Sequence, residues 1–397
     1  MAPSATPNAP SSSPAAGVLD HVRELAPSIA ARAASISAAR RLPADLLAAL
    51  TAAGCLRLLL PRSHGGGGAD LPGAMRVFEA LSRADGSVGW TVMIGASAWC
   101  DIAGLPRVTF DALYAGGPDV VGGGVINPTG SAVPAGGGYR VRGRWAFASG
   151  CEHCGWLSAT CVEADGDGPR PDGAGPRLRT VVFSPSEVEI EDTWKVSGLC
   201  GTGSHHFAAR AVLVPAERTF STVEAAPCVD EPVVRIPPPA LYALQVACVA
   251  TGVAQGALDE LLALAPGKVP FLAGAPLTAS PLFEHQLATA DTELRAARGL
   301  LYADAEAAWA AAVAGAPFAP EQRARIRATA AWATARAAAV VGAAYHAGGG
   351  SALYLDSPLQ RRLRDVHAVT QHFLVKPDAL TTAGAVFAGQ EVDLTLF

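Results

Sequence analysis

One short stretch of the sequence combines two aromatic rings with a hydroxyl group. Residues 144–150 read RWAFASG, and regular alternation along a strand would put Trp145, Phe147 and Ser149 on the same side. Such a face, ending at a glycine, is suited to form a wall for a planar ring, with backbone groups near the ring's polar edge. Periodicity alone favours the simpler alternative, a core strand followed by a turn.

A second stretch whose residues could take part in binding or catalysis is the turn Gly201-Thr202-Gly203-Ser204, which two histidines follow directly. A glycine-rich turn is weak evidence for a binding site by itself. Adjacent residues in a strand point to opposite faces, so at most one of His205 and His206 is expected to face a pocket. We assign neither a catalytic role.

Two further groups lie on expected helices. Gln371 and His372 end a long helix, where a histidine ordinarily packs or caps, and Trp90 lies in a helix where core packing is the ordinary role of an aromatic residue. Cys151 and Cys154 form a C-x-x-C pair, but no second pair of ligands stands at a suitable spacing, so no metal site is predicted.

Composition narrows the class of protein. Half of the 397 residues are apolar, 16% are charged and the formal net charge is −5, which argues against a nucleic-acid partner or a polybasic membrane binder. No uninterrupted apolar run reaches the roughly 18–20 residues that a membrane span needs. The first residues lack the basic start and apolar core of a secretion signal, and the eight cysteines lack the regular spacing of a disulfide scaffold. A soluble, cytoplasmic protein is expected.

Changes in sequence pattern divide the chain into four parts. Residues 1–17 are rich in Pro, Ser and Ala and predict a flexible tail, and residues 18–117 show the three-and-four spacing of helices. Residues 118–232 change to short β-rich runs separated by turns. Residues 233–397 predict a bundle with long helices near 240–265, 281–314, 320–347 and 359–373. The fold class is therefore mainly α with a β domain.

Alanine dominates the expected bundle. A smooth alanine face buries little area per residue, so the bundle would gain by packing against copies of itself. A GC-rich genome would explain the same abundance, and both explanations stay open.

Four stretches together resemble the acyl-CoA dehydrogenase superfamily, and in particular its two-component flavin-dependent monooxygenase branch. They are AGCLRLLLPRSHGGGGADL with SRADGSVGW, GGGYRVRGRWAFASGCEHCGW, DTWKVSGLCGTGSHHF and SPLQRRLRDVHAVTQH. The resemblance covers nearly the whole chain after the tail. It implies an N-terminal helical domain, a central small β-barrel, a C-terminal four-helix bundle and a homotetramer.

The resemblance also assigns roles to residues. It implies that His372 is catalytic and acts as the base that deprotonates a phenol-like hydroxyl or an equivalent N–H of the substrate, and that Ser149 holds the flavin and its peroxide. The other residues that it assigns are, for the cofactor, Trp145, Phe147, Gly201, Thr202 and Ser204, and, for the substrate, Trp90 and Gln371. Phe373 falls where common acyl-CoA dehydrogenases carry their glutamate base, which puts their chemistry in doubt.

The implied reaction uses reduced flavin, FADH2 or FMNH2, supplied by a separate NAD(P)H:flavin reductase, with O2 as cosubstrate. A flavin C4a-hydroperoxide would hydroxylate a small aromatic or natural-product substrate in a dry pocket. Only Lys268 stands where the dehydrogenases place an arginine for the FAD pyrophosphate, so FMN and FAD both remain possible. The alternatives are an acyl-CoA dehydrogenase-like dehydrogenase or oxidase, an N-oxygenase similar to nitrososynthases that acts on an amino sugar, and an inert scaffold.

Overall fold

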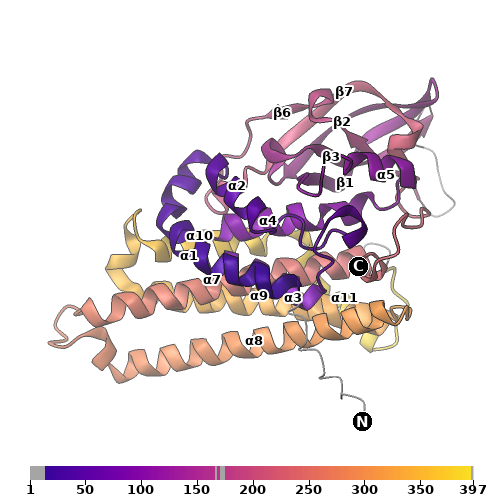
Figure 1. Cartoon of the computed structure of the whole chain (residues 1–397). Helices are drawn as coiled ribbons and strands as arrows, with labels where there is room; N and C mark the ends of the chain where they lie inside the picture. Colours follow the sequence, from indigo (N-terminus) through magenta and orange to yellow (C-terminus); the bar gives the residue numbers. More distant parts are fainter. Residues whose placement is uncertain (1–13, 166–167, 170–174, 395–396) are drawn as a thin grey trace, which may run out of the picture.

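The computed structural model describes residues 14–165, 168–169, 175–394 and 397. A curled β-sheet lies on one side of the molecule, the N-terminal helices lie beside and beneath it, and a bundle of long helices forms the opposite side (Figure 1). This order along the chain is the one that the sequence pattern predicts.

The N-terminal part is helical. Its α-helices are α1 (Pro14–Ala39), α2 (Ala44–Ala52), α3 (Leu71–Ala84), α4 (Gly86–Ser97) and α5 (Arg107–Leu113). The Asp85 carboxylate caps α4 by accepting hydrogen bonds from the backbone N–H groups of Ser87 and Val88, at 3.0 and 3.1 Å. Of the expected tail, residues 1–13 lie outside the described residues, and residues 14–17 form the first turn of α1 rather than a tail.

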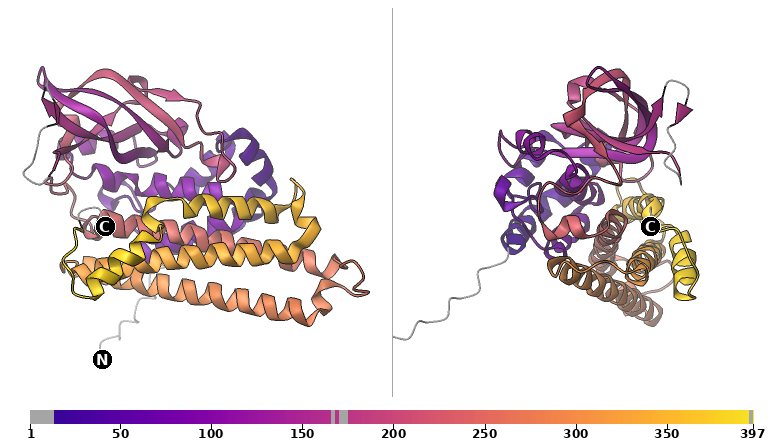
Figure 2. Two further views of the ribbon diagram at one scale, coloured as in Figure 1. Left: turned by 180° about the vertical axis from the view of Figure 1, so that it is seen from behind. Right: turned by 90° about the vertical axis from the view of Figure 1, so that its right-hand side faces the viewer.

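The β domain is one curled sheet (Figure 2). Its strands are β1 (Gly122–Ala135), β2 (Gly138–Ala148), β3 (Trp156–Asp165), β4 (Gly168–Pro169), β5 (Leu178–Phe183), β6 (Glu189–Glu191), β7 (His205–Pro215) and β8 (Thr219–Ser221). The order across the sheet is β6-β7-β2-β1-β3-β5-β8, with β4 paired to β3. Strands β1 and β3 are parallel, and the other neighbours are antiparallel.

The C-terminal part begins with a short helix, α6 (Pro232–Arg235), and continues as the bundle. Its helices are α7 (Pro238–Leu264), α8 (Pro281–Val313), α9 (Pro320–Gly348), α10 (Pro358–Thr370) and α11 (Asp378–Phe387). The four long helices expected from the sequence thus have bounds close to those predicted, because Pro and Gly mark their ends. The β domain and α10 lie next to each other in both views of Figure 2.

Helix α7 is the central helix of the molecule. By length and composition it could cross a membrane, yet nearly all of it is buried inside the protein, which is typical of a core helix. Gly252 allows α3 to approach it, since a Cβ there would lie 2.4 Å from the backbone oxygen of Glu79. Gly256 does the same for Arg362 of α10, at 2.5 Å. Helix α7 is therefore held at short separations from α3 and from α10, the helix that leads to His372.

Candidate active site between the β domain and the bundle

The stretch RWAFASG does not form the flat wall that alternation predicts. The pairing of β2 with β7 shifts between Trp145 and Ala148, and Phe147 adopts a left-handed backbone conformation with φ of 69°. The shift turns the two rings apart. Trp145 is fully buried in the sheet interior, where its Nε1 donates to the Thr160 carbonyl at 2.9 Å. The assignment of Trp145 to the cofactor wall is therefore wrong, because its ring packs in the core of the β domain.

Phe147 instead presents its ring to the outside. The side chain is 69% exposed and meets the rings of Trp194 and His206 edge-on, at centroid distances of 6.2 and 6.0 Å. A bulky residue with positive φ carries backbone strain of about 1–3 kcal/mol, and such strain concentrates at functional sites. Phe147 remains a candidate for contact with a planar ligand.

Four of the residues singled out from sequence form one chain of hydrogen bonds. The Trp90 indole Nε1 donates to the Ser149 hydroxyl at 2.9 Å. The Ser149 and Ser204 hydroxyls lie 2.7 Å apart, and those of Ser204 and Thr202 also lie 2.7 Å apart. Thr202 then donates to the Leu199 carbonyl at 2.9 Å. We call these three hydroxyls, of Ser149, Ser204 and Thr202, the hydroxyl chain. It joins α4, the end of β2 and the loop before β7.

Leu199 anchors the far end of the hydroxyl chain. It also has a left-handed backbone, with φ of 50°, and its carbonyl accepts a second bond from Trp194 Nε1 at 3.1 Å. Its N–H donates to Asp365 of α10 at 2.7 Å. Burial and the neighbouring Asp85 raise the pKa of Asp365 to about 7. A bundle helix thus fixes the loop on which the hydroxyl chain rests.

His372 follows the other end of the same helix. Its ring meets Trp90 edge-on at a centroid distance of 5.5 Å, and Phe373 is tilted against it at 5.0 Å. Burial, and the charge of Arg327, lower the pKa of His372 to about 4, so the imidazole is neutral at pH 7. Its Nδ1 accepts a long hydrogen bond, 3.4 Å, from the backbone N–H of Leu374. Nε2 therefore carries the hydrogen in this arrangement.

Two other assigned residues have different surroundings. Gly201 packs against α1 and α4, where a Cβ would lie 2.4 Å from Ile36, and its N–H donates to Ser87 at 3.1 Å. Its small size therefore serves a close approach between elements. Gln371 is exposed, and its amide donates to Thr370 at 3.2 Å. The structure does not place either with the Trp90, Ser149 and His372 group.

The opposite orientation predicted for the two adjacent histidines is confirmed. His205 is buried, and its Nδ1 accepts from the N–H groups of Thr193 and Trp194, each at 3.2 Å. His206 points to the other face, toward Phe147.

The residues at this junction fit a flavin. A flavin ring needs an apolar face and, along one edge, polar groups able to reach its ring nitrogens. Phe147 offers an exposed ring and Trp194 a partly exposed one, and Ser149, two residues after Phe147, carries a hydroxyl that bonds to Trp90 and Ser204. Thr91, which lies against Gly150, has a buried hydroxyl that has no hydrogen-bond partner among the described residues. Such an unsatisfied group is available to a bound molecule.

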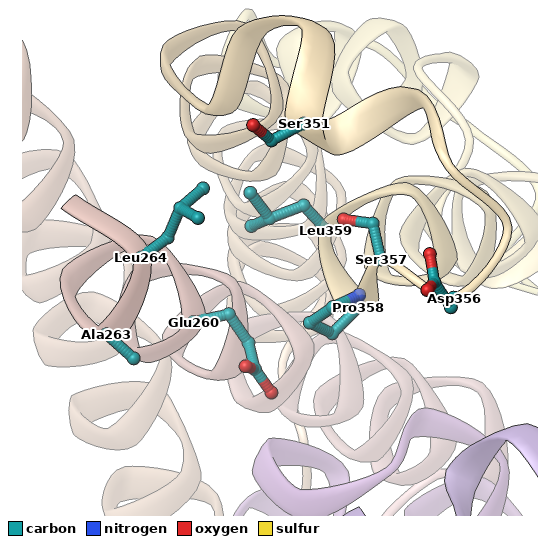
Figure 3. Close-up of a pocket in the computed structure, with 8 residues that line it drawn as sticks. All are labelled: Glu260, Ala263, Leu264, Ser351, Asp356, Ser357, Pro358 and Leu359. Carbon is teal, nitrogen blue, oxygen red and sulfur yellow. The ribbon is translucent and has the colours of Figure 1, made fainter. Parts of the chain in front are cut away.

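A separate groove, of about 330 Å³, lies at the far end of the bundle (Figure 3). Leu264 of α7 and Leu359 of α10 face each other across it, with the carboxylates of Glu260 and Asp356 below and beside them. It opens at the start of α10, whereas His372 follows the end of that helix, about 20 Å away. Nearby, Lys268 Nζ donates to the Gly348 carbonyl at 2.6 Å and to Ser351 at 2.9 Å.

Sequence reasoning missed three residues of the site. Trp194 and Leu199 lie inside a stretch that the resemblance had marked, but nothing in the sequence signals a left-handed leucine. Asp365 lies in the last of the four stretches, but no role was assigned to it. Asp365 shares the buried face of α10 with the apolar residues Leu359, Val366 and Val369, and a charged residue at such spacing was the available signal, since a buried carboxylate requires partners.

Comparisons with known proteins show which family shares this arrangement of a helical domain, a β domain and a helical bundle. The model of the acyl-CoA dehydrogenase N-terminal domain matches residues 16–104, and that of the C-terminal domain matches residues 244–377. The crystal structure of 3-HSA hydroxylase from Rhodococcus sp. RHA1 has a TM-score of 0.87 and 27% identity, covering 96% of this chain and 99% of that one. The three-part architecture is thus that of the acyl-CoA dehydrogenases.

Sequence relatives narrow the class further. Indole-3-acetate monooxygenase of Pseudomonas putida is 33% identical over 96% of both chains. The oxygenase component of the FADH(2)-dependent resorcinol hydroxylase of Rhizobium sp. is 30% identical over 87% of both chains. The chain belongs to the reduced-flavin-dependent monooxygenases that share the acyl-CoA dehydrogenase fold. It is an enzyme that hydroxylates its substrate.

Proposed function

We propose that this protein is the oxygenase component of a two-component system that hydroxylates a small aromatic compound. The observation that carries the proposal is the meeting of Trp90, Ser149 and His372 at the junction of α4, β2 and the end of α10. Bound reduced flavin, FMNH2 or FADH2, supplies the activation of O2 that allows one oxygen atom to reach the substrate. A separate NAD(P)H:flavin reductase would provide the reduced flavin, as the name of the resorcinol hydroxylase component implies for that relative.

The substrate is held next to His372 in this proposal. A neutral imidazole whose Nε2 carries the hydrogen donates a hydrogen bond, which suits the oxygen of a phenolate or a carboxylate. The base role implied by the resemblance needs the opposite tautomer, in which the contact with Leu374 is lost. We therefore assign His372 as a donor that positions the substrate oxygen. The rings of Trp90 and Phe373 beside it favour an aromatic substrate.

The tetramer expected from the family resemblance is retained as part of the proposal. The connection between α7 and α8 exposes Phe271 and Leu272 by 93% and 89%, and the segment after α9 exposes Tyr354 and Leu355 by 70% and 87%. The bonds of Lys268 to the end of α9 and to Ser351 hold these two segments together. An apolar surface of this kind is typical of an interface between subunits. A cytoplasmic location is also proposed.

The test is reconstitution with a purified NADH:flavin reductase, NADH, and either FMN or FAD. Indole-3-acetate, resorcinol and an amino sugar serve as trial substrates, with ¹⁸O₂ used to mark the product. We expect O2 consumption only with the reductase, and a labelled hydroxylated product from an aromatic substrate. A labelled nitroso or hydroxylamino sugar would identify an N-oxygenase. A protein that purifies with bound yellow flavin and oxidises acyl-CoA would contradict the proposal.

A further inference from the structure

The turn that follows His372 is held by a side chain from another helix. Residues Phe373–Val375 form a short 3-10 turn directly after the histidine. Leu374 lies in the middle of this turn and is bonded on two sides. Its N–H donates to His372 Nδ1 at 3.4 Å, and its carbonyl accepts from Arg327 Nε of α9 at 3.2 Å. Leu374 therefore links the imidazole to α9.

Arg327 is a buried cation, and an aromatic ring covers it. The residue is only 4% exposed, and its guanidinium carbon lies 4.6 Å from the centre of the Phe397 ring. A cation over the face of an aromatic ring is attracted by the ring's electrons, most strongly where water is excluded. The ring of Phe397 thus keeps water from the group that bonds to Leu374.

Phe397 is held in this position by its backbone and by its side chain. Arg323, one turn before Arg327 in α9, donates to the backbone oxygen of Leu394 and, at 2.8 Å, to that of Phe397. The ring is 8% exposed and packs in an apolar cluster between α9 and α11. The other fully buried members of this cluster are Ala324, Ala331, Ala379, Ala383 and Val386. Most of them are alanines, which leave room for one large ring.

Loss of the ring would loosen the turn. Water would then reach the guanidinium of Arg327 and compete for its hydrogen-bond donors, so the bond to the Leu374 carbonyl would be held less firmly. The turn would lose one of its fixed contacts, and the imidazole of His372 would move more freely. A displacement of about 1 Å at a positioning group can lower a reaction rate by about 10²-fold.

We propose that Phe397 is a positioning residue for His372. It covers Arg327, and Arg327 holds the turn that orients the imidazole toward the substrate. The inference rests on the proposed function, because it takes the coupling of O2 consumption to product formation to depend on His372. Phe397 acts through Arg327 and Leu374 and needs no contact with substrate or flavin.

The experiment compares three variants of the full chain. Phe397→Ala removes the ring, and Phe397→Tyr retains a ring that can cover Arg327. Val386→Ala is the matched control, because it removes apolar volume from the same cluster and leaves the ring in place. Hydrogen exchange of peptides that contain Leu374 is followed by mass spectrometry. Product and H2O2 are measured with the reductase, reduced flavin and indole-3-acetate or resorcinol, whichever is hydroxylated.

Phe397→Ala is expected to change both measurements. The amides of the turn should exchange about tenfold faster, as the loss of one buried cation–ring contact implies. Product formed per O2 consumed should fall several-fold, with the missing oxygen released as H2O2. Phe397→Tyr should restore both values. Val386→Ala should lower the melting temperature and leave both values unchanged.

A double variant tests whether Phe397 acts through Arg327. Arg327→Met removes the donor to Leu374 and should by itself reduce coupling. Adding Phe397→Ala to Arg327→Met should then cost little more, because the two residues act in one series of contacts. Fully additive losses would overturn the proposed route from Phe397 to His372.

The outcomes separate this inference from the proposed function. Unchanged exchange of the turn in Phe397→Ala, or an equal effect of Val386→Ala, overturns the positioning role. So does faster exchange with coupling intact, provided that His372→Ala loses coupling. If His372→Ala keeps full coupling, the function proposed for His372 is wrong, and hydrogen exchange alone then decides whether Phe397 holds the turn. Thermal unfolding checks each variant, and Phe397→Leu replaces Phe397→Ala if the latter does not fold.

Discussion

The imidazole of His372 lies among groups that keep it uncharged. Trp90 and Phe373 shield it from water, and Arg327 adds a positive charge nearby. A donor role and a base role for this residue predict different behaviour on substitution, so the two can be separated by the choice of side chain.

His372→Gln retains an N–H donor but cannot take up a proton. If the donor role is right, this variant keeps most of the coupling between oxygen consumed and product formed, while His372→Ala loses it and releases H2O2. If His372 is a general base, both variants lose product formation by roughly 10²–10⁴-fold. Product and peroxide measured together in the two variants, with flavin affinity as the check on folding, decide between the roles.

The lowered pKa of His372 also makes stability depend on pH. In the unfolded chain the imidazole takes up a proton near its ordinary pKa, about 6.5, but in the folded protein only near 4. The unfolded state therefore binds more protons between these values, and the free energy of unfolding falls as pH drops from about 6.5 to 4. We expect His372→Gln to remove about 1–2 kcal/mol of that fall. Urea unfolding at pH 7 and pH 4.5 measures this fall in the free energy of unfolding. An equal fall in the unmodified protein and in His372→Gln would refute the lowered pKa of His372.

The individual residues of the site were predictable only in part. Trp90, Ser149, Thr202, Ser204 and His372 were found from four separate stretches, yet no sequence pattern showed that the first four share hydrogen bonds. The error at Trp145 has a definite cause. Alternation assumes an unbroken strand, whereas β2 has a break in its pairing just after that residue.

At the scale of elements, α10 links the two halves of the site. Asp365 holds Leu199 and so the loop 199–204, and Arg364 donates to the Ser197 carbonyl at 2.9 Å. Gly198 lies so close that a Cβ would be 2.0 Å from the Arg364 carbonyl oxygen. The loop before β7 and the helix that leads to His372 thus act as one unit.

Substitutions of Asp365 should show how far the loop before β7 depends on α10 for its stability. Asp365→Ala leaves the buried N–H of Leu199 without an acceptor and should lower the free energy of unfolding by about 1–3 kcal/mol. Asp365→Asn keeps an oxygen in place and should cost much less. Denaturant unfolding compares them, and an equal loss in both variants would mean that the carboxylate charge, not the hydrogen bond, holds the loop.

The close packing of α7 against α3 predicts that a larger residue at Gly252 will destabilise the protein. Gly252→Ala forces a Cβ to within 2.4 Å of the Glu79 backbone oxygen and should destabilise the protein by about 1–3 kcal/mol. Gly384→Ala, at an exposed position of α11 where a Cβ would meet nothing within 4 Å, should stabilise it by about 0.5–1 kcal/mol. Melting temperatures that move in the same direction for both would contradict the observed helix spacing.

Helices were the elements that sequence predicted best. The bundle helices carry Pro at their starts, and the bounds of α7, α8 and α9 agree with those expected within about two residues. The short strands β4, β6 and β8 have too few residues for a pattern to appear, and their pairing depends on contacts distant in sequence.

For the whole molecule, the proposed tetramer follows from the apolar segments at one end of the bundle. Light scattering at micromolar concentration should give four times the mass of the 40.4 kDa chain. Replacing Phe271 and Leu355, both strongly exposed, with Asp should produce smaller species while far-ultraviolet circular dichroism stays unchanged. If the unmodified protein has the mass of a monomer in this measurement, the proposed tetramer is wrong.

Trp90 provides an optical reporter inside the site. Its indole is 7% exposed, bonds to Ser149 and faces the ring of His372. Indole emission responds to the polarity and to the hydrogen bonding of its surroundings, so a molecule that binds there should change the intrinsic fluorescence. The difference between the unmodified protein and Trp90→Phe would isolate that signal from the six other tryptophans. Binding of a colourless substrate could then be followed without turnover.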